Sequence, residues 1–153
     1  MPHPEQPDRP SAQPPPQPRP WTIELGELDR RMGVEVHEQS PQRVVISMPV
    51  EGNRQSFGLL HGGAMVAMAE AAGSWAAVIH GSLLGKVAVG LDINATHHRS
   101  SRQGRVVATA TAIPLGSSTT THEVIVEHED GARLCTARIT NFLKDAPAGP
   151  PTS

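Results

Sequence analysis

The spacing of apolar residues changes along the chain, and each change predicts a different element. Over residues 21–32 the apolar positions are three and four residues apart, which predicts a short amphipathic helix that ends at Gly33. Residues 33–37 and 43–49 follow. In the second segment Val44, Ile46 and Met48 alternate with Val45 and Ser47, which is typical of a strand. The pattern therefore predicts one helix and then two strands joined by a short turn.

Residues 62–81 are rich in alanine and apolar on nearly every face of a helix. Glu70 is the only acid in this segment, which contains neither Lys nor Arg. A helix without a polar face has to be covered on most sides. We expect this helix to lie at the centre of the fold.

Beyond residue 81 the period becomes two, and clusters of turn-forming residues separate segments rich in Val, Thr and Ile. The predicted strands are 87–97, 104–115, 119–127 and 133–143. Two short strands, one buried helix and four strands in hairpin series indicate the α+β class. The economical arrangement is an antiparallel sheet wrapped around one long central helix.

The two ends of the chain differ from this middle part. Residues 1–20 contain nine prolines, and no apolar run there would serve as a signal peptide. Proline resists both helix and sheet, so we expect 1–20 to be a disordered tail, and 144–153 another. The folded domain is expected over 21–143.

Composition narrows the class of function. A formal net charge of -2 argues against nucleic-acid binding, and no run approaches the ~18 consecutive apolar residues of a membrane span. The lone Cys135 cannot form an intramolecular disulfide, which suits a reducing cytoplasm. His97 and His98 are adjacent in a predicted strand and point to opposite faces, so they do not form a metal pair. We expect no metal, and one of the two histidines packed inward near the site.

Glu70 is the first candidate for chemistry. A carboxylate in a buried helix is costly unless it is paired, neutralised or used. The alternative is that Glu70 faces solvent, with Ser74 one turn later on the same side. The sequence just before the helix favours a functional role.

That sequence is His61-Gly62-Gly63, which leaves backbone N–H groups uncovered at a helix start. Such an end suits a phosphate, or the oxyanion that develops on a carbonyl under attack. The alternative is simply a tight entry into the helix. Gly62 and Glu70 are separated by about 12 Å along one helix, at ~1.5 Å per residue, so they cannot act on the same carbonyl. If both are catalytic, the site is shared between two subunits, and a monomer is inactive.

Two blocks of sequence, residues 55–74 and 89–99, resemble the hotdog-fold acyl-CoA thioesterases of the glutamate type. The resemblance is to the phenylacetate-pathway and 4-hydroxybenzoyl-CoA branch, close to 1,4-dihydroxy-2-naphthoyl-CoA hydrolase and the enterobactin-pathway proofreading thioesterase. It covers about 21–143. It implies hydrolysis of an acyl-CoA, aromatic in this branch, by a cytoplasmic homodimer or homotetramer that needs no cofactor.

The resemblance assigns catalytic roles residue by residue. Glu70 matches the carboxylate that acts as nucleophile or general base. Gly62 and Gln55 match the N–H and the side-chain amide that polarise the thioester carbonyl. Ser74 matches a hydroxyl that assists around the carboxylate or water, and His61 matches a supporting histidine. For His61 the alternative is a helix-entry residue bonded to backbone.

The resemblance also implies where coenzyme A binds. Arg99 matches a basic residue that contacts phosphate, and it clusters in sequence with Arg102 and Arg105. The other positions expected near substrate or nucleotide are His97, Gly63, Ser117 and Ser118. The alternative for these turns is that they are ordinary solvated loops.

Three rival functions share this fold. Hotdog dehydratases need a histidine with an acid partner, and their usual His-Phe-Pro and Pro-Gly patterns are missing here. A non-catalytic acyl-CoA-binding protein would lack the carboxylate. A proofreading enzyme acting on acyl-carrier proteins uses the same chemistry and stays open. Two positions depart from the family pattern: Ser56 stands where many relatives have Pro, and Met65-Val66 replace smaller residues that would face the acyl pocket.

Overall fold

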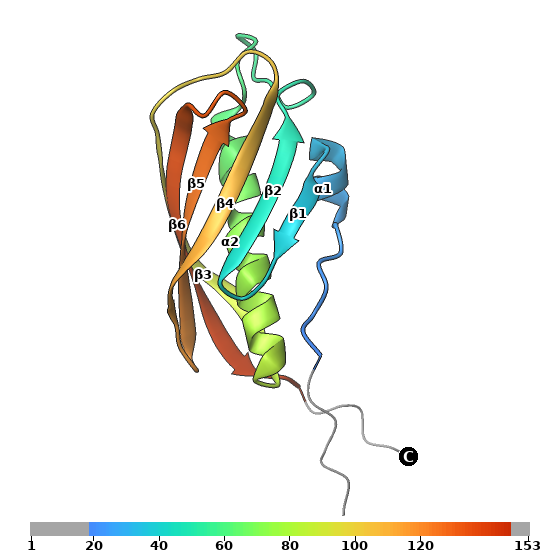
Figure 1. Ribbon diagram of the computed structural model, residues 1–153, viewed down its shortest axis with the longest axis vertical. Coiled ribbons are helices and arrows are strands. Elements are labelled where there is room, and N and C mark those ends of the chain that lie inside the picture. The colour runs from blue at the N-terminus through green and yellow to red at the C-terminus, as the bar shows by residue number, and fades with distance from the viewer. Residues whose placement is uncertain (1–18, 148–153) are drawn as a thin grey trace, which may run out of the picture.

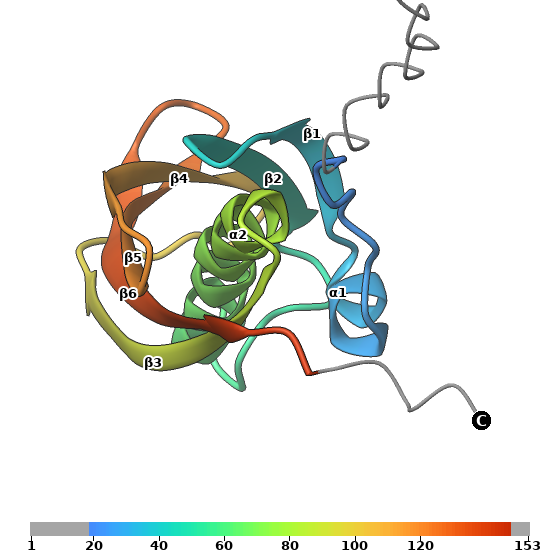
Figure 2. The same cartoon turned by 90° about the horizontal axis from the view of Figure 1, so that it is seen from below.

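The computed structural model describes residues 19–147, which form one antiparallel sheet curled around one long helix (Figure 1). In chain order the elements are α1 (Glu27–Met32), β1 (Glu35–Gln39), β2 (Arg43–Pro49), α2 (Gly62–Leu83), β3 (Lys86–His97), β4 (Arg105–Leu115), β5 (Thr119–His128) and β6 (Arg133–Asp145). The sheet order is β1-β2-β4-β5-β6-β3. Seen from the end in Figure 2, α2 lies in the hollow of the curved sheet.

The predicted central helix is confirmed and is two residues longer than expected, ending at Leu83 rather than Gly81. Its apolar side chains, Met68 among them, pack against the inward face of the strands, which includes Ile46 on β2 and Val124 on β5. All three residues are fully buried. Gly73 marks the closest approach, because a Cβ added there would lie 2.1 Å from Cγ2 of Ile139 on β6. The helix and sheet therefore fit together only with glycine at this position.

By length and composition alone α2 could also cross a membrane, as one 18-residue window has a mean hydropathy of 1.3. Half of that window is buried inside the fold. Core helices share this composition because they too are surrounded by apolar groups.

The strand β3 forms one edge of the sheet, and none of its residues is fully buried. It pairs with β6 on one side, and no strand among residues 19–147 pairs with its other side. Two large apolar residues on it, Val89 and Leu91, are 42% and 61% exposed. An open apolar edge of twelve residues is a surface onto which another strand can pair.

The prediction of a helix over 21–32 is wrong in its first half. Residues 21–25 are not helical: Trp21, Ile23 and Leu25 pack alternately against the core. The helix begins only after Gly26, whose N–H donates to Asp29 Oδ2 over 2.7 Å. The apolar residues of 21–25 fit the two-residue spacing of extended chain as well as the three- and four-residue spacing of a helix. Packing against the core selects the extended form.

The remaining boundaries follow the predicted pattern closely. Gly33 ends α1 with a φ of 71°, a left-handed conformation that favours glycine. The strand β6 runs to Asp145, beyond the expected end at residue 143. Apart from 19–20 and 144–147, the tails expected at 1–20 and 144–153 lie outside the described residues.

Candidate active site

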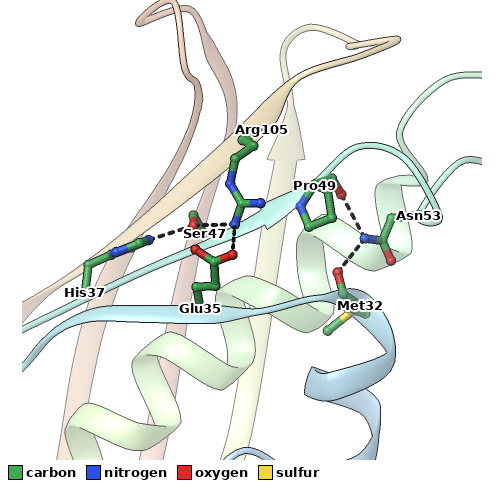
Figure 3. Close-up of polar contacts among 7 residues, drawn as sticks. All are labelled: Met32, Glu35, His37, Ser47, Pro49, Asn53 and Arg105. Carbon is green, nitrogen blue, oxygen red and sulfur yellow. Dashed lines mark hydrogen bonds and ion pairs between the residues drawn. The ribbon is translucent and has the colours of Figure 1, made fainter.

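The loop between β2 and α2 carries the first predicted site residues, and buried Asn53 fixes its path. Asn53 Nδ2 donates to the carbonyl oxygens of Met32 over 2.7 Å and Pro49 over 2.8 Å (Figure 3). The Asn53 carbonyl accepts the N–H of His61 over 2.9 Å. The side chain of Asn53 thus ties α1 to β2, and its backbone carbonyl ties the same loop to the start of α2.

Replacing Asn53 with Ala should lower the free energy of unfolding by about 2–4 kcal/mol, because two buried carbonyls lose their donor. Urea unfolding followed by circular dichroism measures this change. Gln42→Ala, at an exposed turn position, is the control and should change the free energy by no more than about 0.5 kcal/mol. A similar small change in Asn53→Ala would show that the loop does not depend on this side chain.

Gln55, Gly62, His97 and Arg99 meet in one hollow of about 440 Å³ at the start of α2. Gln55 Oε1 accepts the N–H of Phe57, so the amide NH₂ is left to donate outward. The N–H of Gly62 has no acceptor among residues 19–147. The hollow therefore combines two donor groups with apolar walls from Leu59, Leu60 and Met65.

His97 packs against the backbone of Gly62, since a Cβ added to Gly62 would lie 3.1 Å from His97 Nε2. This contact explains why glycine stands at the helix start. His98 Nε2 lies 2.9 Å from Thr136 Oγ1. Both histidines are exposed and both line the hollow of Gln55 and Gly62, so the expectation that one packs inward and the other faces outward is not confirmed.

His61 and Gly63 lie elsewhere. The N–H of Gly63 donates to His61 Nδ1 over 2.8 Å, so this ring caps the helix. Both residues line a groove beside Leu28 and Met32 rather than the hollow that contains Gln55. This is the helix-entry arrangement that the sequence left open, and it keeps His61 apart from the donors.

Glu70 lies midway along α2 and is exposed to solvent in the single chain. It lines a separate hollow of about 170 Å³ with Gly90, Leu91, Asp92, Ile93 and Ile139. This hollow lies beside the open edge strand β3. Ser74, one turn further along α2, donates to Asn141 Oδ1 on β6 over 3.4 Å.

The predicted carbonyl donors and the predicted carboxylate therefore lie in two different places on one chain. The donors Gln55 and Gly62 are at the start of α2, and the carboxylate is about 12 Å further along its axis. No single hollow contains both Gly62 and Glu70 among those found in the described part of the chain. One copy of this chain does not bring the two groups to one carbonyl.

The arginines near residue 100 also separate. Arg99 lines the donor hollow. Arg105 turns instead towards Glu35, at 3.1 Å, and donates to Ser47 Oγ over 2.9 Å (Figure 3). Arg102 lies beside Phe57, whose carbonyl accepts from it over 3.4 Å. Only Arg99 and Arg102 are thus placed near the donors.

Ser117 and Ser118 are in the turn between β4 and β5, where both are exposed. His80 and Lys86 hold this turn: His80 Nε2 lies 2.9 Å from the carbonyl oxygen of Gly116, and Lys86 Nζ donates to that of Ser117 over 2.5 Å. The turn is therefore at the end of α2 opposite to Gly62.

Sequence reasoning did not single out Asn53, Lys86 or Asn141. Each lies in a segment whose residue pattern predicts only a turn or a strand. The group that its side chain contacts cannot be identified before the fold is known. A polar residue at an inward position of a predicted strand, such as Asn141 next to alternating Ile139 and Leu143, was the available signal.

Two other titratable groups are buried in the core. Burial lowers the pKa of His122, despite a contact with the carbonyl oxygen of Pro41 that raises it. Burial raises the pKa of the Cys135 thiol, which opposes thiolate formation. Among residues 19–147 no group of three or more His, Cys, Asp or Glu side chains is arranged to hold a metal ion.

Comparison with known proteins agrees with this architecture. The family model for the thioesterase superfamily matches residues 57–135. Thioesterase PA1618 of Pseudomonas aeruginosa is 40% identical over 117 residues, which cover 76% of this chain and 79% of that protein. Its crystal structure, of a glutamine-to-alanine mutant, superposes with a TM-score of 0.72, covering 76% of this chain and 84% of the solved one.

The proofreading thioesterase EntH of Cronobacter turicensis is 36% identical over 120 residues, covering 78% of this chain and 87% of that protein. A hypothetical thioesterase of Streptococcus pneumoniae, solved with coenzyme A, shares the fold at 17% identity and a TM-score of 0.66, covering 75% of this chain and 88% of that one. The chain belongs to the thioesterase superfamily and has the hotdog fold. It is a thioester hydrolase.

Proposed function

We propose that this protein hydrolyses acyl-CoA thioesters in a site built from two copies of the chain. The observation that carries the proposal is the separation of Glu70 from the donors Gln55 and Gly62, each in a hollow of its own. A two-fold dimer would bring the carboxylate of one copy to the donors of the other and form two equivalent sites.

The open edge of β3 supports a particular way of pairing. Within one chain Gly90 lies beside Glu70, and His97 lies against Gly62. Antiparallel pairing of two β3 strands about an axis near Asn94 sets Gly90 opposite His98 of the partner subunit. Glu70 then lies level with the donor hollow of the partner, and the exposed apolar residues of β3 become covered.

In the proposed reaction, water and the thioester give a free acid and the CoA thiol. The Gly62 N–H and the Gln55 amide of one subunit stabilise the negative charge that develops on the carbonyl oxygen; one such donor is typically worth ~3 kcal/mol. Glu70 of the other subunit attacks the carbonyl carbon and the CoA thiolate leaves, which gives a mixed anhydride that water then hydrolyses to the free acid and the carboxylate of Glu70. Alternatively, Glu70 takes a proton from a water molecule that attacks the carbonyl carbon directly. In both routes a proton of the water ends on the departing thiolate.

The CoA group is proposed to lie with its phosphates near Arg99, the cation that lines the donor hollow. The Streptococcus pneumoniae structure supports only that this fold can hold coenzyme A.

An aromatic acyl group follows from the sequence resemblance alone. We place the enzyme in the cytoplasm as a homodimer at minimum, with the homotetramer as a further expectation.

A second candidate function is proofreading of wrongly loaded acyl-carrier proteins. It is favoured by the 36% identity to EntH over most of this chain. The two candidates share the same catalytic groups, and they differ only in what carries the acyl group.

Thiol release from a panel of thioesters tests these proposals. The panel contains benzoyl-, 4-hydroxybenzoyl-, phenylacetyl-, 1,4-dihydroxy-2-naphthoyl- and short aliphatic CoA, with the same acyl groups on a carrier protein. We expect the wild type to release thiol fastest from aromatic CoAs. Faster release from the carrier protein would favour proofreading, and release from neither carrier would contradict the proposed function.

A further inference from the structure

Asn141 is a buried polar residue close to the proposed catalytic carboxylate. It lies on the inward face of β6 and is only 1% exposed. Its neighbours across the sheet are Gly90 on β3 and Thr120 on β5. Burying an amide between a helix and a sheet is costly unless the group has a polar partner, so this position calls for a reason.

Its partner is the hydroxyl of Ser74, which donates to Asn141 Oδ1 over 3.4 Å. The amide nitrogen Nδ2 is buried and has no partner among residues 19–147. The side chain of Asn141 is therefore turned with its oxygen towards α2, at the helical turn that follows Glu70.

The same amide lies close to Glu70, with Gly90 beside both. Gly90 has no side chain, and a Cβ built there would lie 4.0 Å from Asn141 Oδ1 and 4.0 Å from Glu70 Oε1. Glu70 and Ser74 are four residues apart on α2 and so lie on one face of the helix. The carboxylate and the amide thus both lie next to Gly90 of β3, and the hydroxyl lies one helical turn from the carboxylate.

The direction of the Ser74 hydrogen bond has a chemical consequence. While the hydroxyl gives its proton to Asn141, its oxygen can only accept a hydrogen bond from the space beside Glu70. A water molecule there would give one proton to Ser74 and the other to Glu70, which leaves its lone pair free to attack. Without Asn141 the hydroxyl would be free to donate its proton to Glu70 or to the water, and the water would lose the acceptor that orients it.

We propose that Asn141 is a positioning residue that fixes Ser74 as a hydrogen-bond acceptor beside Glu70. The inference rests on the proposed function and concerns the case in which Glu70 acts as general base. It assigns a role to a residue that touches neither substrate nor the reacting atoms.

The test is Asn141→Leu, which keeps the size of the side chain and removes the acceptor. We expect kcat for the best thioester of the panel to fall about 10–100-fold, with KM within about twofold of wild type. A merely structural loss would change KM together with kcat.

Two further variants sharpen the result. Ser74→Ala should lose as much activity as Asn141→Leu, and the double variant should lose no more than either single change, because both remove one interaction. The control is Thr120→Val, which alters the buried polar neighbour of Asn141 on β5 without touching Ser74. It should leave both kcat and KM unchanged. Asn141→Ala serves in the same comparison if circular dichroism shows that Asn141→Leu does not fold.

The outcomes separate this inference from the proposed function. A wild type that releases no thiol, or a Glu70→Gln variant of full activity, contradicts the proposed function. A wild type that depends on Glu70, together with a folded Asn141 variant whose kcat is unchanged or whose KM changes as much as its kcat, overturns the role of Asn141 alone. Additive losses in the double variant overturn it as well.

Discussion

Glu70→Gln is expected to lower kcat for thioester hydrolysis by at least about 10³-fold, because the amide can neither attack the carbonyl carbon nor accept a proton from water. The variant keeps the shape of the side chain, and Glu70 is exposed at a hollow rather than buried in the core. The fold and the affinity for CoA should therefore change little. Steady-state thiol release, with CoA affinity measured by calorimetry, checks both parts.

The matched control is Glu123→Gln, an exposed carboxylate on the outward face of β5 opposite Arg138. It should hydrolyse the same thioester at the wild-type rate. Equal activity in Glu70→Gln would remove the carboxylate from the mechanism and leave the position without an assigned role.

Gln55→Ala is expected to reduce kcat by about 10²–10³-fold, the usual effect of losing one donor to a developing oxyanion. The donor is oriented before substrate arrives, because the N–H of Phe57 holds Oε1 and leaves the NH₂ group facing the hollow beside Gly62. Since the charge on the carbonyl oxygen grows in the transition state, the loss should appear in kcat more than in KM.

Gln103→Ala provides the control, since Gln103 is an exposed amide in the turn before β4. Its kinetic constants should equal those of the wild type. A Gln55→Ala variant with a raised KM and unchanged kcat would instead show that Gln55 binds the substrate without stabilising the transition state.

Much of this fold could be predicted because its patterns are unambiguous. Only one segment, 62–81, is apolar all round, and a helix of that kind has to be enclosed by the strands that follow it. The separation of Gly62 from Glu70 along one helix follows from the helical rise alone. The expectation of a divided site therefore needed no tertiary information, and the two separate hollows agree with it.

The failures have physical reasons. Residues 21–25 fit two periods, and contacts with the core decide between them. In a helix that is apolar on every face, the sequence does not show which neighbouring element a short polar side chain will contact. The sequence therefore could not show that His61 caps the helix, or that Ser74 turns towards Asn141 on a strand 67 residues away in sequence.

The central claim is that each site takes Glu70 from one subunit and its donors from the other. The direct test is to mix the inactive Glu70→Gln and Gln55→Ala proteins, unfold and refold them together, and measure thiol release. A mixed dimer has one site with both defects and one intact site, so an equal mixture should regain about a quarter of wild-type activity. A mixture as inactive as its two components would contradict the shared site.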